Sequence, residues 1–128
     1  MIRFVLMRLL PILLITLALI SCQRARDARE LKKQHKAEAV PITGMLSYLA
    51  DAASFVPCGT NEKLVVKFKG DWLAVERAYT NMRRDGQPTY VAFRGRMEND
   101  TTDGTVRPGI IIEEITDMRP DTSCVRPS

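Results

Sequence analysis

An apolar run opens the chain and stops abruptly. Residues 9–20 are almost purely apolar, interrupted by Pro11 and Thr16, and a short stretch carrying Arg3 and Arg8 precedes them. A membrane-spanning helix needs roughly 20 apolar residues, and this run is shorter. A basic start, a short apolar run and a polar continuation are typical of a secretory signal peptide. The pattern therefore predicts an exported precursor.

The next segment, residues 23–39, is charged and has almost no apolar stripe beyond Leu31. It is rich in helix formers, but a helix that is polar on all faces has nothing to bury. We therefore predict a tether, at about 1.5 Å per residue where helical. His35 has no ligand-type neighbours at helical spacing, so we interpret it as a solvated side chain.

The folded part of the chain is predicted to begin near Pro41. We predict a strand over residues 45–50 that bends through residues 51–53, and a turn where Pro57 and Gly59 flank a cysteine. A second short strand is predicted over residues 63–69 and ends at Gly70.

A helical period follows from Asp71, a good N-cap residue, to about Arg84. Its apolar positions recur at helical spacing, so one face is expected to pack on the core. These positions are Trp72, Val75, Tyr79 and Met82. Residues 85–88 combine glycine and proline and should end the helix.

A final hairpin is predicted from strands over residues 89–97 and 109–118, with Asp103-Gly104 as the turn. A bulge is expected at Glu113-Glu114, where alternation slips. In the first strand one face holds Val91, Phe93, Gly95 and Met97, and the other holds Tyr90, Ala92, Arg94 and Arg96. The fold class is thus mainly β with one helix: a small, partly open barrel with the helix closing one end.

The positive net charge of +4 does not belong to this barrel. Residues 41–128 carry eleven basic and twelve acidic side chains, whereas residues 22–40 carry six and three. The barrel therefore has no electrostatic footprint for nucleic acid. We predict three segments: a signal peptide (1–21), a charged tether (22–40) and one barrel domain (41–128).

The apolar run ends in Leu19-Ile20-Ser21-Cys22, which resembles the lipobox of bacterial lipoproteins. The resemblance implies that Cys22 receives a diacylglyceryl group, and finally palmitate-type acyl chains, and becomes the first mature residue. Acyl chains of this kind hold a protein on a bilayer. Gln23 is not the aspartate that retains lipoproteins at the inner membrane, which implies the outer membrane, facing the periplasm. An uncleaved anchor or an ordinary signal peptide is the alternative.

Three cysteines are an awkward number in a secreted protein. Assigning Cys22 to lipid leaves Cys58 and Cys124, which in an oxidising envelope most simply form a disulfide. Two free thiols or a metal-binding pair remain the alternatives.

The barrel residues resemble a known family, the C-terminal domain of NlpE lipoproteins, over about residues 42–124. The matching features are Gly44, Tyr48, the run 50–53, Phe55, Cys58, the helix phrase over 71–79, the last hairpin and Cys124. The resemblance implies an OB-type barrel and an outer-membrane lipoprotein linked to copper resistance and envelope stress. The family's separate N-terminal domain and its Cys-x-x-Cys pair are not expected in this chain.

We expect a non-enzymatic protein that acts by binding another envelope protein, with the membrane held through Cys22. Histidine is absent after residue 40, so no Ser-His or Cys-His arrangement is available. Neighbouring Glu113 and Glu114 point to opposite faces of a strand, which does not suit a paired-carboxylate site. Asp51 at a strand end is more typical of a turn than of catalysis. No cofactor is expected.

Two further binding hypotheses remain. A copper- or metal-binding lipoprotein is the alternative function, but the soft ligands Met45, Met82, Met97 and Met118 do not group locally, and we predict no metal site. Tyr90, Arg94 and Arg96 share a strand face that suits a sugar or anion, and equally suits an ordinary solvated face.

Overall fold

The chain divides into two compact units, with the boundary between His35 and Lys36. The computed structural model describes residues 2–124. Helix α1, Ile2–Glu38, is continuous and contains both Pro11 and Cys22. The charged segment that we predicted as a tether is thus helical almost to its end. Within residues 2–124, no helix combines the length and the apolarity needed to cross a membrane.

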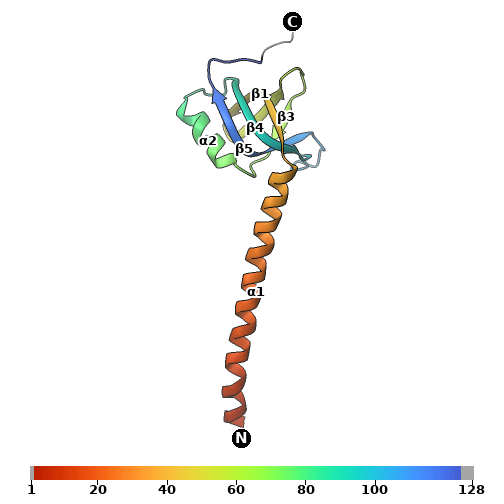
Figure 1. The fold of residues 1–128 in the computed structure, drawn as a ribbon. Helices are drawn as coiled ribbons and strands as arrows, with labels where there is room; N and C mark the ends of the chain where they lie inside the picture. Colours follow the sequence, from red (N-terminus) through yellow and green to blue (C-terminus); the bar gives the residue numbers. More distant parts are fainter. Residues whose placement is uncertain (1, 125–128) are drawn as a thin grey trace. The chain divides into compact units, whose positions relative to one another are not determined.

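The second unit is a closed barrel of five strands (Figure 1). Around the barrel the strands follow the order β1-β2-β3-β5-β4, with β3 parallel to β5 and every other neighbouring pair antiparallel. Helix α2 connects β3 to β4. This confirms a mainly β, OB-like fold, although the ring is closed where the sequence predicted a partly open one. The elements are β1 (Val40–Leu49), β2 (Ala52–Pro57), β3 (Leu64–Val66), α2 (Trp72–Asn81), β4 (Thr89–Met97) and β5 (Gly109–Arg119).

The prediction of one bent strand over residues 45–53 is wrong, because this part of the chain forms a hairpin of two strands, β1 and β2. β1 begins earlier than expected, and after Ala50 and Asp51 the chain returns as β2, which the sequence analysis did not separate. Both turn residues have a positive φ, 48° and 62°. Two-residue hairpin turns of this hand usually carry Asn-Gly or Asp-Gly, so Ala-Asp gave no turn signal.

The second hairpin confirms the prediction closely. β4 covers the predicted residues, and β5 ends at Arg119, one residue later than expected. The pairs Arg94–Glu114 and Gly95–Ile112 leave Glu113 without an opposite residue, which is the predicted bulge. Met97 was predicted on the same strand face as Val91 and Phe93, which are buried, but it is 57% exposed because it is the last residue of its strand.

The core fills the barrel and extends to α2. Phe55 of β2 and Phe93 of β4 pack edge to face, with ring centroids 5.0 Å apart. Trp72, Val75 and Tyr79 of α2 belong to the same buried cluster, as the helical period predicted. The helix ends at Asn81, three residues earlier than predicted, so Met82 lies beyond it and is not part of this cluster. One face of α2 therefore closes the barrel core.

Asp71 occupies the N-cap position of α2, as the sequence predicted, but its side chain does not cap the helix. Instead its carboxylate accepts a hydrogen bond from the Ile115 amide (3.3 Å), and its own amide donates to the Ile112 carbonyl (2.8 Å). Asp71 thus joins the start of α2 to β5 on both sides of the bulge.

Candidate functional site: a basic groove over β2 and β3

A groove of about 740 Å³ lies over strands β2 and β3. Its walls include residues 52–54 of β2 and Val65 and Val66 of β3. The β1–β2 turn contributes Asp51, and the β4–β5 loop contributes Thr102. Two strands and two loops that are far apart in the sequence therefore make one concave surface.

Four cationic side chains line this groove. Lys63 directly precedes β3, Lys67 and Lys69 follow it, and all three side chains line the groove. Arg107 adds a fourth cation from the β4–β5 loop. Two carboxylates, Asp51 and Asp100, also line the groove, so its lining carries a net charge of +2 in a barrel domain that is nearly neutral as a whole.

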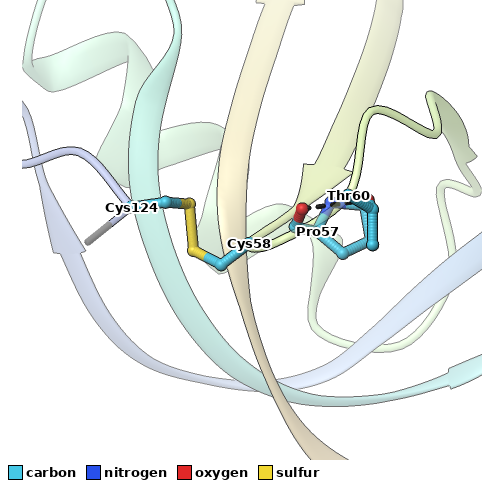
Figure 2. The surroundings of a disulfide bond; sticks show 4 residues. All are labelled: Pro57, Cys58, Thr60 and Cys124. Atoms are coloured by element: carbon cyan, nitrogen blue, oxygen red, sulfur yellow. Dashed lines mark hydrogen bonds between the residues drawn. A yellow bond between two sulfur atoms is a disulfide. The ribbon is translucent and has the colours of Figure 1, made fainter. Parts of the chain in front are cut away.

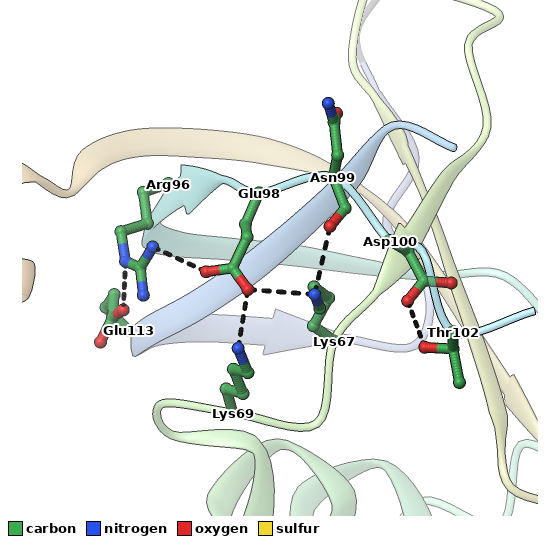
Figure 3. A network of polar contacts seen from close by, with 8 residues as sticks. All are labelled: Lys67, Lys69, Arg96, Glu98, Asn99, Asp100, Thr102 and Glu113. Atoms are coloured by element: carbon green, nitrogen blue, oxygen red, sulfur yellow. Dashed lines mark hydrogen bonds and ion pairs between the residues drawn. The ribbon is translucent and has the colours of Figure 1, made fainter. Parts of the chain in front are cut away.

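Glu98 holds two of the lysines in place (Figure 3). Its carboxylate lies 2.7 Å from the Lys69 ammonium, 3.0 Å from that of Lys67 and 3.0 Å from the Arg96 guanidinium. Arg96 also reaches Glu113 at 2.9 Å. Hydrogen bonds from Lys69 and then Lys67 lower the pKa of Glu98 from 4.5 to about 2. The carboxylate therefore stays ionised and fixes the lysines at the groove.

Two aromatic side chains, Tyr48 and Phe68, line the groove near the lysines, and both pack against Trp72. Phe68 is half exposed and stacks on Trp72 with ring centroids 4.6 Å apart, and Tyr48 meets Trp72 edge to face at 5.2 Å. The Tyr48 hydroxyl donates to Glu76 (2.8 Å), and this hydrogen bond raises the pKa of Tyr48. Phe68 is thus an apolar surface held between Lys67 and Lys69.

Side-chain contacts order the β4–β5 loop at the far end of the groove. Asp100 is buried and accepts a hydrogen bond from the Thr102 hydroxyl (2.7 Å), which lowers the pKa of Asp100. The backbones of Asp100 and Arg107 exchange two hydrogen bonds, and the Arg107 guanidinium pairs with Asp103 at 2.8 Å. The loop is therefore pre-formed.

The fold and these positions can be set against known proteins. Residues 36–125 match the family described as the NlpE C-terminal OB domain, which is most of the chain and all of the barrel. The chain belongs to the NlpE C-terminal OB domain family. This confirms the resemblance that the sequence suggested. In OB barrels the face of strands 2 and 3, between the loops that flank it, is a common binding surface, and the groove lies there.

A solved structure shares this fold. The crystal structure of the Cpx pathway activator NlpE from Escherichia coli superposes with a TM-score of 0.57 at 22% sequence identity. The alignment covers 70% of this chain and 45% of that protein, so this chain matches less than half of its length. At this identity the likeness shows the fold alone. No curated protein sequence matches the chain.

The three cysteines of this NlpE-family chain lie in two settings. Cys22 is exposed in α1 and forms no disulfide in the described chain. Cys58 and Cys124 are joined by a disulfide that bridges the end of β2 and the segment after β5 (Figure 2). Next to it, Thr60 donates its amide to the Pro57 carbonyl, which closes the predicted turn.

The strand face suggested for a sugar or anion is already occupied by internal contacts. Arg94 donates to the carbonyl of buried Ala39 (2.6 Å), and Arg96 is shared between Glu98 and Glu113. Tyr90 is half-buried beside them. The arginines therefore make contacts within the barrel unit, to Ala39, Glu98 and Glu113, instead of presenting a ligand site.

Residues considered for metal or acid–base chemistry are dispersed. Met45 lies opposite Tyr90 on the outer face, whereas Met118 packs against the core opposite Val91. Met82 is the C-cap residue after α2, and Met97 is the last residue of β4. Within residues 2–124, no three His, Cys, Asp or Glu side chains are grouped as metal ligands.

The carboxylates considered for catalysis also have separate environments. Glu113 pairs with Arg96, and Glu114 pairs with Lys36 at 3.2 Å. Asp51 is an exposed turn residue, as predicted. His35 lies in α1 and not in the barrel. Glu113, Glu114 and Asp51 therefore do not come together as a paired-carboxylate site.

Sequence reasoning did not find the groove. Its one visible signal was the alternation of lysines in residues 63–69, which we interpreted only as a strand. The opposing wall comes from β2, which was not predicted, and from a loop more than 30 residues later in the chain. The groove forms only when the closed barrel brings β2, β3 and the β4–β5 loop together, so no single segment of the sequence indicates it.

Proposed function

We propose that this chain is a lipid-anchored, non-enzymatic protein of the cell envelope that acts in envelope-stress signalling by binding another envelope protein. The family supports this, and the solved relative is titled an activator of the Cpx pathway. The 22% identity and the partial coverage of that relative make the pathway a proposal for this chain. The single observation that carries the binding role is the pre-formed groove with Phe68 at its wall.

The anchor places this groove at a membrane. Cys22 ends the apolar run, follows a small serine and is exposed, so its thiol is accessible to acylation. Gln23 after the anchor favours the outer membrane, with the barrel in the periplasm. Cells labelled with radioactive palmitate should incorporate it into the wild-type protein and not into Cys22→Ala.

Among residues 2–124, no group of three His, Cys, Asp or Glu side chains supports the copper-homeostasis alternative. The described methionines do not converge, and the cysteines of the barrel are joined to each other. Titration of the oxidised protein with Cu(I) should give no stoichiometric binding, and a tight one-to-one complex would favour that alternative.

Site-specific crosslinking tests the groove directly. A photoreactive phenylalanine analogue replaces Phe68 in the full-length protein, and in a matched variant it replaces Val40, which is 55% exposed and outside the groove. We expect one discrete adduct with an envelope protein from position 68 and none from position 40. Equal adducts from both positions, or no adduct from either, would refute the groove as a docking site.

A signalling readout complements the crosslink. Lys63 lines the groove, is exposed and has no ion pair among residues 2–124, so Lys63→Glu reverses a groove charge without breaking an internal contact. Overproduced wild-type protein should raise an envelope-stress reporter, and Lys63→Glu should lower that response several-fold. The control is Arg77→Glu, at an exposed position of α2 outside the groove. It makes the same change of charge and should leave the reporter response at the wild-type level.

A further inference from the structure

Charge is segregated around the helical tether. In a helix successive residues turn by about 100°, so Arg26, Arg29, Lys32 and Lys33 fall within an arc of about 120°. We name these four residues the basic stripe. Asp27 and Glu30 fall outside the arc, about 100° or more from its centre. The helix gathers most of the positive charge of this segment on one face, with Arg24 as the exception, about 140° from the centre of the arc.

The basic stripe is available to a partner. All four of its side chains are exposed. Within residues 2–124, no ion pair involves Arg26, Arg29 or Lys32, and Lys33 has only an exposed pair with Glu30 at 3.3 Å. Such exposed pairs contribute little and exchange readily. The stripe has no apolar counterpart, so a partner that needs a hydrophobic face does not fit it.

We propose that the basic stripe binds the anionic phosphate headgroups of the membrane that carries the anchor, so that the tether lies along the bilayer surface. This inference rests on the lipid anchor of the proposed function. The stripe begins four residues after Cys22 and ends eleven residues after it. A row of cations next to a lipid anchor is the arrangement that recognises anionic lipids.

Distance decides the orientation of the tether. At about 1.5 Å per residue, an upright helix would carry Lys33 about 16 Å from the anchor. That is about two Debye lengths at physiological salt, where attraction to the headgroups is mostly screened. A helix that lies parallel to the surface brings all four cations to the phosphates. The stripe then faces the headgroups, and Asp27 and Glu30 face away.

Vesicle binding without the acyl chains tests the proposal. The chain from residue 22 onward, with Cys22→Ser, is sedimented with vesicles of phosphatidylcholine or of phosphatidylcholine and phosphatidylglycerol at about two to one. Each cation near an anionic surface strengthens binding about fivefold, so we expect binding to the mixed vesicles and little to the neutral ones. Binding should weaken as salt shortens the Debye length.

A charge-swapped variant separates the stripe from net charge. Asp27→Arg combined with Arg29→Asp keeps the composition and puts an aspartate at the centre of the stripe. We expect affinity for the mixed vesicles to fall about tenfold or more, with the helical circular-dichroism signal unchanged. Equal affinity of the swapped variant, or equal binding of the wild type to both vesicles, would overturn the proposal.

This outcome is distinguishable from a failure of the anchor. Palmitate labelling reports on Cys22 alone, whereas the Cys22→Ser chain reports on the stripe alone. A labelled Cys22 with no lipid preference would remove the stripe and leave the anchor. Headgroup binding without labelling would remove the anchor and leave the stripe.

Discussion

Glu98 is the residue at which the charges beside the groove converge. Its carboxylate is 29% exposed, and it contacts Lys67, Lys69 and Arg96. Because Lys67 and Arg96 are themselves mostly buried, removing Glu98 would leave two poorly solvated cations close together. Charge at this position therefore affects both stability and the shape of the groove.

We predict that Glu98→Gln destabilises the barrel at neutral pH by about 1–2 kcal/mol. The pKa of Glu98 falls from 4.5 to about 2 on folding, so its contribution is present above pH 4.5 and is lost as pH falls towards 2. The difference between wild type and variant should therefore shrink over this range. Urea unfolding at several pH values measures it.

The control for Glu98 is Glu62→Gln, an exposed glutamate with no ion pair among residues 2–124. It should change stability little at any pH. A Glu98→Gln deficit that stays constant from pH 6 to pH 2 would show that charge is not the cause.

Gly44 shows why a residue without a side chain can be required. A Cβ at this position would collide with the Val56 carbonyl and with the ring of Phe55. Because the first is backbone and the second is fully buried core, neither moves freely. We predict that Gly44→Ala destabilises the barrel by about 1–3 kcal/mol in thermal or urea unfolding.

Gly104 provides the comparison. Nothing lies within 4 Å of a Cβ there, but its φ is +79°. Gly104→Ala should therefore cost about 1 kcal/mol through backbone strain alone. If the two variants lose the same stability, close packing at Gly44 is not the reason for its glycine.

At the scale of an element, α2 is fixed to the barrel by Asp71. Serine is as good an N-cap residue as aspartate but is shorter, whereas asparagine keeps the reach and one acceptor oxygen. We predict that Asp71→Ser lowers the free energy of unfolding by about 1–2 kcal/mol and that Asp71→Asn loses distinctly less. Urea titrations of both variants measure the difference. An unaffected Ser variant would restore the capping role.

The elements differ in how far the sequence predicted them. The β4–β5 hairpin was predictable because buried and exposed residues alternate along β4 and glycine marks the turn. β2 was missed because the turn Ala50-Asp51 takes two positive φ values without a glycine. The surrounding strand pairs hold that turn, and such tertiary support leaves no local signal.

At the scale of the whole molecule, the sequence predicted the class of fold but not the groove. A signal that lies within one segment, such as the alternation along β4, could be interpreted directly. The groove combines β2, β3 and a loop that begins after Met97, so it depends on how the barrel closes. The partners of two arginines could not be predicted for the same reason. Arg94 meets Ala39, and Arg96 meets Glu113, only when the barrel has folded.

The disulfide stabilises the barrel as a whole. It joins cysteines 66 residues apart and ties the end of β2 to the segment after β5. Closing a loop of this length removes unfolded-state entropy worth about 4 kcal/mol in the chain-entropy model. We predict that Cys58→Ser, Cys124→Ser and the double variant lose similar amounts of stability in urea unfolding, because each removes the same crosslink. A double variant much less stable than either single one would show that the two side chains contribute separately, by packing.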